Sequence, residues 1–539
     1  MSFRKSFFKR LGLFSFLFLF FALQSPAFSQ EESDYEAGYN FWAEDKPNEA
    51  IEAITRALDS GTLTETEIAA SHYIRGYSYW EIDEDEKAVA DLTAAIDAGL
   101  LNDETKGNAY RLRGTAYWIL GDEEKTLEDL TTSISISPDP SDPLYRRAHF
   151  FLSKEENEDA FGDIFILATQ FPDTMNYVGM RYVWNVVRWA KEEGKKDELY
   201  EFLLALRESK YTGPDGQYST DGLMQELALL HLERGENNRA LILIFTIDDT
   251  QTILETLVDN RYAALWETGV YKAHSFLDNV LEKELALNKA KMEEMPANTD
   301  VVQWYANSLR SAGRSEEAIA ILKDALANQD RFEIEDEDDI LWLKNELAYA
   351  YQDVADLENS FKMFEEILEV PLEENGRAVS QYINFSISLL EAGEFEKSLA
   401  QIKATTHNYS SDFGTMFLLM GEACVLHEIG QKDEAAALGD EIYQRWEDNP
   451  SAAQVALLCL ERSDDAAELV INRLADEDQR TSVLVAIQDY LPGRPNLPYK
   501  AVLLDRYQAV LGRPEVMAEI DKYGRVIDVP LMSTYWGDF

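Results

Sequence analysis

The sequence predicts an all-α protein built from repeated pairs of helices, on three observations. Three similar pentapeptides, GYNFW, GYSYW and GTAYW, begin at the equally spaced glycines Gly38, Gly76 and Gly114. Small and apolar residues follow each glycine at the same offsets, with spacings of three and four that place them on one helical face. Short polar stretches, EDKPNE, IDEDEK and GDEEK, divide each unit. Each unit therefore reads as helix A, a turn and helix B.

Residues 1–29 have the layout of a cleaved secretory signal peptide. Basic residues at the N-terminus precede an apolar run from Leu11 to Leu23, and SPAFSQ follows with small residues suited to cleavage before Gln30. The apolar run is too short for an ordinary membrane span, and no later stretch is long and apolar enough to cross a bilayer. No cysteine lies near the cleavage site, so a lipid anchor is not expected. We expect a mature chain that is periplasmic or secreted.

Residues 30–172 are predicted to form the first array of repeats. The small and aliphatic positions of helix B recur in three successive units as Ala50, Ile54, Ala57; Ala88, Leu92, Ala95; and Thr126, Leu130, Ser133. A fourth unit begins at Ala148, after a slightly shorter step from Gly114, and prolines follow the third and fourth units. These units resemble tetratricopeptide repeats, a family of helix pairs with a usual period of about 34 residues, which the step to Ala148 matches. The resemblance implies a right-handed α-solenoid whose A helices line a concave face.

Three further segments complete the predicted organisation. Residues 173–295 are helical in pattern but degenerate as repeats, and the turn-rich loop 210–222 is either a plain surface loop or a hinge between arrays. Residues 296–447 are predicted to form a second array with the same spacing. Residues 448–539 are expected to form a helical C-terminal cap, because a solenoid must cover its last apolar face. The final stretch, 526–539, is not helical in pattern and is expected to dock on this cap.

Helix A of the first unit carries a narrow stripe of aromatic residues. Tyr35, Tyr39 and Trp42 lie within about 60° of one another on a helical wheel. The next two units repeat these positions, and the complete stripe is Tyr35, Tyr39, Trp42, Tyr73, Tyr77, Trp80, Arg111, Thr115 and Trp118. The resemblance places this stripe on the concave face, where ligands usually bind. The alternative interpretation is that the rings only pack against the neighbouring repeat.

The arginines of the third unit allow two interpretations. Arg111 and Arg113 stand out in a chain with 100 acidic and 49 basic residues and a net charge of −51. They could meet a carboxylate of a partner, but neutralisation of neighbouring acids is favoured. The strong negative charge opposes contact with phosphate backbones, so nucleic acid is not an expected partner.

No pattern of catalysis, cofactor binding or metal binding stands out. The sequence lacks the common zinc-protease, hydrolase and nucleotide-binding motifs, and no histidine has a second His or Cys at metal-ligand spacing. We therefore predict a non-enzymatic scaffold or adaptor that binds partner proteins through the stripe. The alternative is a cell-wall or carbohydrate binder that stacks sugars on Trp42, Trp80 and Trp118. A homo-oligomer that buries these rings is a third possibility.

The two cysteines, Cys424 and Cys459, lie 35 residues apart, a spacing compatible with corresponding helices of neighbouring repeats. Axes of packed helices lie about 8–10 Å apart, whereas a disulfide needs Cα atoms about 4.4–6.8 Å apart. A bridge is compatible with this spacing, but two buried free thiols are the favoured expectation.

Overall fold

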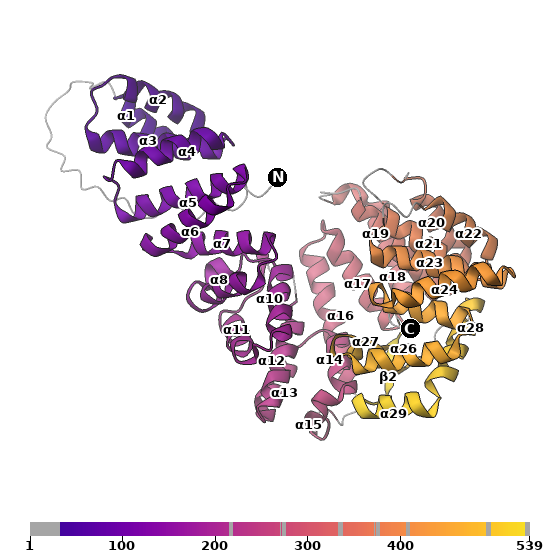
Figure 1. Ribbon diagram of the computed structural model, residues 1–539. Coiled ribbons are helices and arrows are strands. Elements are labelled where there is room, and N and C mark those ends of the chain that lie inside the picture. The colour runs from indigo at the N-terminus through magenta and orange to yellow at the C-terminus, as the bar shows by residue number, and fades with distance from the viewer. Residues whose placement is uncertain are drawn as a thin grey trace. The chain divides into compact units, whose positions relative to one another are not determined.

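A computed structural model describes residues 33–214, 219–269, 271, 276–332, 338–370, 372, 378–405, 410–491 and 497–533. These residues form α-helices α1–α29 and two short strands, so the predicted all-α fold is confirmed (Figure 1). The predicted signal peptide, residues 1–29, and the last six residues of the predicted docked tail lie outside the described residues.

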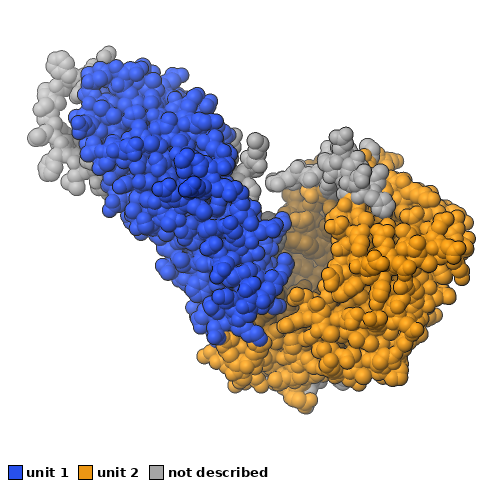
Figure 2. All heavy atoms as spheres, viewed as in Figure 1, with its two compact units in different colours: residues 1–220 blue, residues 221–539 orange. Residues whose placement is uncertain are grey.

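The chain divides into two compact units, residues 1–220 and 221–539 (Figure 2). The division falls inside the turn-rich loop 210–222. Each unit is described by itself below.

The first unit consists of helices joined by short turns. They are α1 (Asp34–Ala43), α2 (Pro47–Asp59), α3 (Glu65–Glu81), α4 (Asp85–Asp97), α5 (Asp103–Leu120), α6 (Glu123–Ile136), α7 (Ser141–Ser153), α8 (Asn157–Gln170), α9 (Pro172–Met175), α10 (Met180–Glu192) and α11 (Lys196–Glu208). The first eight are the four helix pairs that the spacing predicts.

The helix-B positions predicted from the spacing form the core of these pairs. In the second pair Ala88, Leu92 and Ala95 are fully buried, and the matching residues of the other three pairs are at most 2% exposed. Gly76 explains why the first three repeats carry a glycine at this position of helix A. A Cβ on Gly76 would lie 2.9 Å from Leu92 Cγ and 3.1 Å from the Leu92 backbone nitrogen, so the two helices are in close contact there.

A repeated polar clamp joins three helices at each junction between pairs. Arg113 on α5 donates from Nε and Nη2 to Asp129 on α6 at 2.7 and 2.8 Å, and from Nη1 to Thr93 on α4 at 3.0 Å. The same geometry recurs one pair earlier and one pair later, as Arg75–Asp91–Thr55 and Arg147–Asp163–Thr131. The aspartates are 3–6% exposed. The clamp therefore connects both helices of one helix pair to helix B of the preceding pair.

The second unit contains the remaining elements. They are α12 (Asp221–Glu233), α13 (Asn237–Ile244), α14 (Thr250–Val258), η2 (Asn260–Tyr262), α15 (Ala263–Trp266), α16 (Phe276–Glu294), α17 (Thr299–Ser311), α18 (Ser315–Ala327), η3 (Gln329–Arg331), α19 (Asp338–Asp353), α20 (Leu357–Ile367), α21 (Val379–Glu391), α22 (Phe395–Ala404), α23 (Asp412–Glu428), α24 (Lys432–Gln444), η5 (Trp446–Asp448), α25 (Pro450–Cys459), α26 (Ser463–Ala475), α27 (Glu477–Ala486), β1 (Asp489–Leu491), α28 (Pro498–Leu511), α29 (Pro514–Tyr523) and β2 (Asp528–Met532).

The expectation of free thiols is wrong, because Cys424 and Cys459 form a disulfide. Cys424 lies on α23 and Cys459 on α25, and their Cα atoms are 5.2 Å apart. The distance between helix axes is not the distance that decides whether a disulfide can form. Residues on the facing sides of two packed helices lie closer together than the axes do.

The C-terminal segment joins the end of the second unit to its beginning. Arg525 donates from its backbone N to Val258 O at 3.0 Å and from Nε to Leu257 O at 2.6 Å, and its guanidinium lies 3.8 Å from the Trp266 ring centroid. A few residues later, β2 pairs in parallel with β1, which follows α27. The segment thus bridges elements that are far apart in the sequence.

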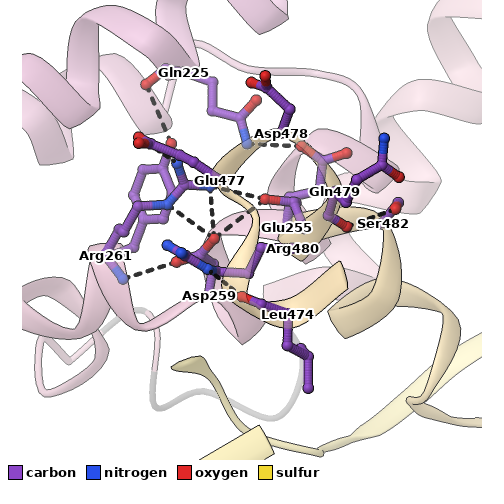
Figure 3. A network of polar contacts seen from close by, with 12 residues as sticks. Gln225, Glu255, Asp259, Arg261, Leu474, Glu477, Asp478, Gln479, Arg480 and Ser482 are labelled. Atoms are coloured by element: carbon purple, nitrogen blue, oxygen red, sulfur yellow. Dashed lines mark hydrogen bonds and ion pairs between the residues drawn. The ribbon is translucent and has the colours of Figure 1, made fainter. Parts of the chain in front are cut away.

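A polar network between η2 and α27 also connects the beginning of the second unit to its C-terminal part (Figure 3). Asp259 is fully buried and accepts hydrogen bonds from Arg261 N, Nε and Nη2 at 2.9, 3.0 and 2.7 Å. The Thr481 hydroxyl on α27 lies 3.2 Å from Asp259 Oδ2 and accepts from Arg261 Nη2 at 2.8 Å. Nearby on α14, Glu255 accepts from Gln225 Nε2 at 2.9 Å.

Glu255 makes the stability of the second unit dependent on pH. Burial, with a contribution from Asp249, raises the pKa of Glu255 to about 7. Because the pKa is raised in the folded state, the stabilisation is fully present below the unfolded pKa near 4.5 and is lost as pH rises through about 7. We expect Glu255→Gln to stabilise the second unit at pH 8 by about 3 kcal/mol relative to the native chain. Denaturant unfolding at pH 5 and pH 8 measures this difference.

Glu477→Gln is the matched control, because Glu477 lies 3.5 Å from Arg261 in the same network but its side chain is 66% exposed. We expect it to keep the native pH profile. A Glu255→Gln chain with the native pH dependence would contradict the assignment.

Candidate binding face of the first unit

The nine residues of the predicted stripe lie on the A helices α1, α3 and α5, but they are not equally accessible. Tyr39 is 39% exposed. Tyr35, Trp42, Tyr77 and Trp118 are partly buried. The other four, Tyr73, Trp80, Arg111 and Thr115, are 5–8% exposed. The stripe therefore presents rings mainly on α1 and α3, and its middle part is covered by protein.

Rings of neighbouring A helices contact each other at the accessible end. The Trp42 ring on α1 lies edge-on to Tyr73 and Tyr77 on α3, with ring centroids 6.3 and 5.7 Å away. Tyr39 lies 5.6 Å from Trp42 on the same helix. Tyr39, Trp42 and Tyr77 thus form one continuous aromatic cluster across two repeats, which we call the tyrosine–tryptophan cluster.

Trp80 is covered by two arginines from the following repeats. The guanidinium carbons of Arg111 on α5 and Arg146 on α7 lie 5.9 and 5.7 Å from the Trp80 ring centroid. Both arginines pair with Asp142, at Nε–O distances of 2.9 and 3.1 Å. Cation–π contacts of this kind are worth about 2 kcal/mol when they are desolvated. Trp80 therefore stabilises the junction between repeats in this structure.

The remaining buried stripe residues have local partners. Tyr73 accepts a hydrogen bond from Asn108 Nδ2 at 2.6 Å, and Asn108 Oδ1 in turn accepts from Arg111 Nε at 2.8 Å. Thr115 donates to the Arg111 carbonyl within helix α5 at 2.8 Å. Arg111 and Arg113 both pair with acids of neighbouring helices, as the favoured interpretation of these arginines expects.

The stripe continues beyond the predicted residues. Tyr145 and His149 on α7 occupy the next matching positions, their rings lie 4.5 Å apart, and His149 lies 4.9 Å from Tyr182 on α10. Burial and the nearby charge of Arg146 lower the pKa of His149 to about 4, so this imidazole is neutral at pH 7. Both residues could have been identified from the sequence. They follow Arg111 and Thr115 by the same number of positions by which Ala148 follows Gly114.

The three tryptophans do not stack on one another as a platform for sugars. Trp42 contacts tyrosines, Trp80 contacts arginines, and Trp118 lies edge-on to Phe150 at 5.7 Å. Only Trp42 and Trp118 keep partly exposed rings. This packing does not favour the carbohydrate-binding alternative, which needs free ring faces.

Two further properties concern only the part of the chain that the structure describes. In that part, no three His, Cys, Asp or Glu side chains are grouped so that they could hold a metal ion. None of its helices combines the length and the apolar character needed to cross a membrane.

Comparison with known families identifies the first two helix pairs. The model of the tetratricopeptide repeat family matches residues 35–102, which cover α1 from its second residue and the whole of α2, α3 and α4. Residues 35–102 are tetratricopeptide repeats. The family predicted from the glycine, the helix-B core and the period is thereby confirmed, and the tyrosine–tryptophan cluster lies within these repeats.

Other comparisons add little about function. No curated protein matches the chain. Three solved structures resemble it over most of its length. A chain of Naa15/Naa10 bound to HypK-THB is 11% identical with a TM-score of 0.29, and the match covers 90% of this chain and 74% of that one. A chain of the APC/C hetero-tetramer Cut9-Hcn1 is 12% identical with a TM-score of 0.30 and coverages of 92% and 96%, and yeast Tom70 is 14% identical with a TM-score of 0.32 and coverages of 91% and 98%. At these identities and TM-scores, nothing about the partners of this chain follows from them.

Proposed function

We propose that the chain is an exported scaffold or adaptor that binds an extended segment of a partner protein along the helix-A stripe of its first unit. The observation that carries this proposal is the tyrosine–tryptophan cluster. It spans two tetratricopeptide repeats and keeps rings partly exposed, with Tyr39 the most exposed of them. Tyrosine and tryptophan dominate protein-binding hot spots, because they offer large contact area at a low cost in conformational entropy.

The type of repeat supports the same proposal. Tetratricopeptide repeats are typically non-catalytic, and stacked helix pairs form extended concave surfaces that solenoid proteins use for binding. Since the rigid stack already holds the rings in place, a partner segment orders little of the scaffold when it binds.

The disulfide supports export. Disulfides form and persist in oxidising compartments such as the bacterial periplasm and the extracellular space, and they are rare in the cytosol. Cys424 and Cys459 are fully buried and bonded to each other. Together with the signal-peptide pattern of residues 1–29, this leads us to expect a mature N-terminus at Gln30.

A capture experiment with one matched control tests the function. Tagged mature chain is incubated with the envelope and secreted fractions of the producing cells, in parallel with a Tyr39→Ala variant. Tyr39 is 39% exposed, so its removal leaves the repeat core intact. We expect a specifically captured protein to bind the variant about tenfold more weakly.

Phe413→Ala is the control, since Phe413 is an exposed aromatic residue of the second unit, with 47% exposure. It should capture the partner as the native chain does. Equal capture by all three chains would remove the stripe from the binding site.

A further inference from the structure

Four arginines are buried in the part of the chain that the structure describes, and one of them differs from the rest. They are Arg111, Arg146, Arg310 and Arg473. Arg111 and Arg146 share Asp142, and Arg310 on α17 pairs with Glu346 and Asp353 on α19, both at 2.7 Å.

Arg473 lies on α26 and is only 2% exposed. Its Nε and Nη1 have no hydrogen-bond partner among the described residues. Burial lowers the pKa of Arg473, and Tyr507 on α28 is the one titratable group that opposes this shift. No carboxylate of the described chain therefore balances its charge, although the protein has 100 acidic residues.

An uncompensated charge at this place is costly. The effective penalty for burying a single ion in a protein is several kcal/mol, even after relaxation. A buried lysine can escape this penalty by losing its proton, but a guanidinium stays protonated at any physiological pH. A water molecule could accept the free N–H groups, yet it would leave the charge unbalanced. The group that satisfies both the donors and the charge is an anion.

The surroundings of Arg473 limit the size of that anion. Leu469, Val470 and Leu474 of the same helix are fully buried, and Tyr507 is 2% exposed. The packing of α26 against α25, α27, α28 and α29 favours a small anion over a peptide chain or a large organic anion. We propose that Arg473 binds a small inorganic anion, chloride under ordinary conditions, in the packed interior between α26 and α28 of the second unit.

Comparison of two sodium salts tests this proposal on the native chain. Amide hydrogen exchange of the peptides covering α26 and α28 is measured in sodium chloride and in sodium gluconate at equal ionic strength, because gluconate is a much larger anion than chloride. An anion present at ten times its dissociation constant slows exchange through unfolding by about tenfold. We expect slowing of at least this size in chloride. Equal exchange in the two salts overturns the proposal and leaves a buried water as the partner of Arg473.

Two variants localise the effect. Arg473→Met replaces the cation by an apolar side chain of similar length, a change that is often neutral or stabilising for a buried charge. We expect it to fold and to exchange equally in both salts. Arg513→Met removes a partly exposed arginine that pairs with Asp464 and should keep the chloride effect. A chloride effect that survives in Arg473→Met assigns it elsewhere and contradicts the proposal. Line broadening of ³⁵Cl in nuclear magnetic resonance provides a second readout, and it should be present with the native chain and absent with Arg473→Met.

Discussion

Replacing Arg113 by leucine is expected to destabilise the first unit by about 3–5 kcal/mol. The substitution leaves Asp129, which is 3% exposed, without its two charge-assisted hydrogen bonds from Arg113. A buried carboxylate without a partner is far more costly than the loss of an exposed ion pair. The clamp also joins three helices, so its loss should loosen α4, α5 and α6 together.

Hydrogen exchange of the mature chain measures this effect region by region. Peptides of α4–α6 should lose protection, whereas peptides of the second unit should not change. The double variant Arg113→Leu, Asp129→Leu should recover most of the loss, because removing both partners of a buried pair is often nearly neutral. Lys125→Ala, which breaks an exposed pair with Asp122, should change stability by less than about 1 kcal/mol. A double variant as unstable as the single one would show that the clamp acts through packing and not through charge.

Removing the disulfide is expected to destabilise the second unit by about 3–4 kcal/mol. Cys424 and Cys459 are 35 residues apart, and cross-linking a loop of that length lowers the entropy of the unfolded chain by an amount of this order. The double variant Cys424→Ala, Cys459→Ala avoids the need to reduce a fully buried bond. Its unfolding in denaturant should shift for the second unit alone.

Alkylation provides the matching chemical measurement. The native chain, denatured without reductant, should take up no iodoacetamide, and it should take up two equivalents after reduction. Labelling without reductant would contradict the disulfide and would remove one of the supports for export.

The repeat core could be predicted because it depends on local spacing. Residues such as Ala88, Leu92 and Ala95 follow the helical period within one unit, and all three are fully buried. The helical wheel also placed Trp42 and Trp80 on one face. It could not show that Arg146 covers Trp80, since this arginine belongs to the second repeat after the one that contains Trp80.

Polar interior residues were harder to predict. Asp129 looks like one of many solvated acids when it is read in isolation, and its burial depends on Arg113 being 16 residues away on the facing helix. The signal was nevertheless present, because an arginine precedes the glycine or alanine of helix A, and an aspartate precedes the aliphatic residue of helix B, in three successive units.

The contacts between the beginning of the second unit and its C-terminal part have no local signal in the sequence. Thr481 contacts Asp259 across 222 positions of the chain, and no repeat period connects the two residues. Such contacts depend on the path of the whole array, which the spacing within one helix pair does not determine.

The central claim is that a partner protein occupies the helix-A stripe of the first unit. Hydrogen exchange of the mature chain, measured with and without the captured partner, tests it most directly. The proposal predicts slower exchange in peptides of α1 and α3, which carry the tyrosine–tryptophan cluster, and a smaller slowing in the Tyr39→Ala variant at the same partner concentration, because this variant binds more weakly. Protection confined to the second unit, with α1 and α3 unchanged, would contradict it.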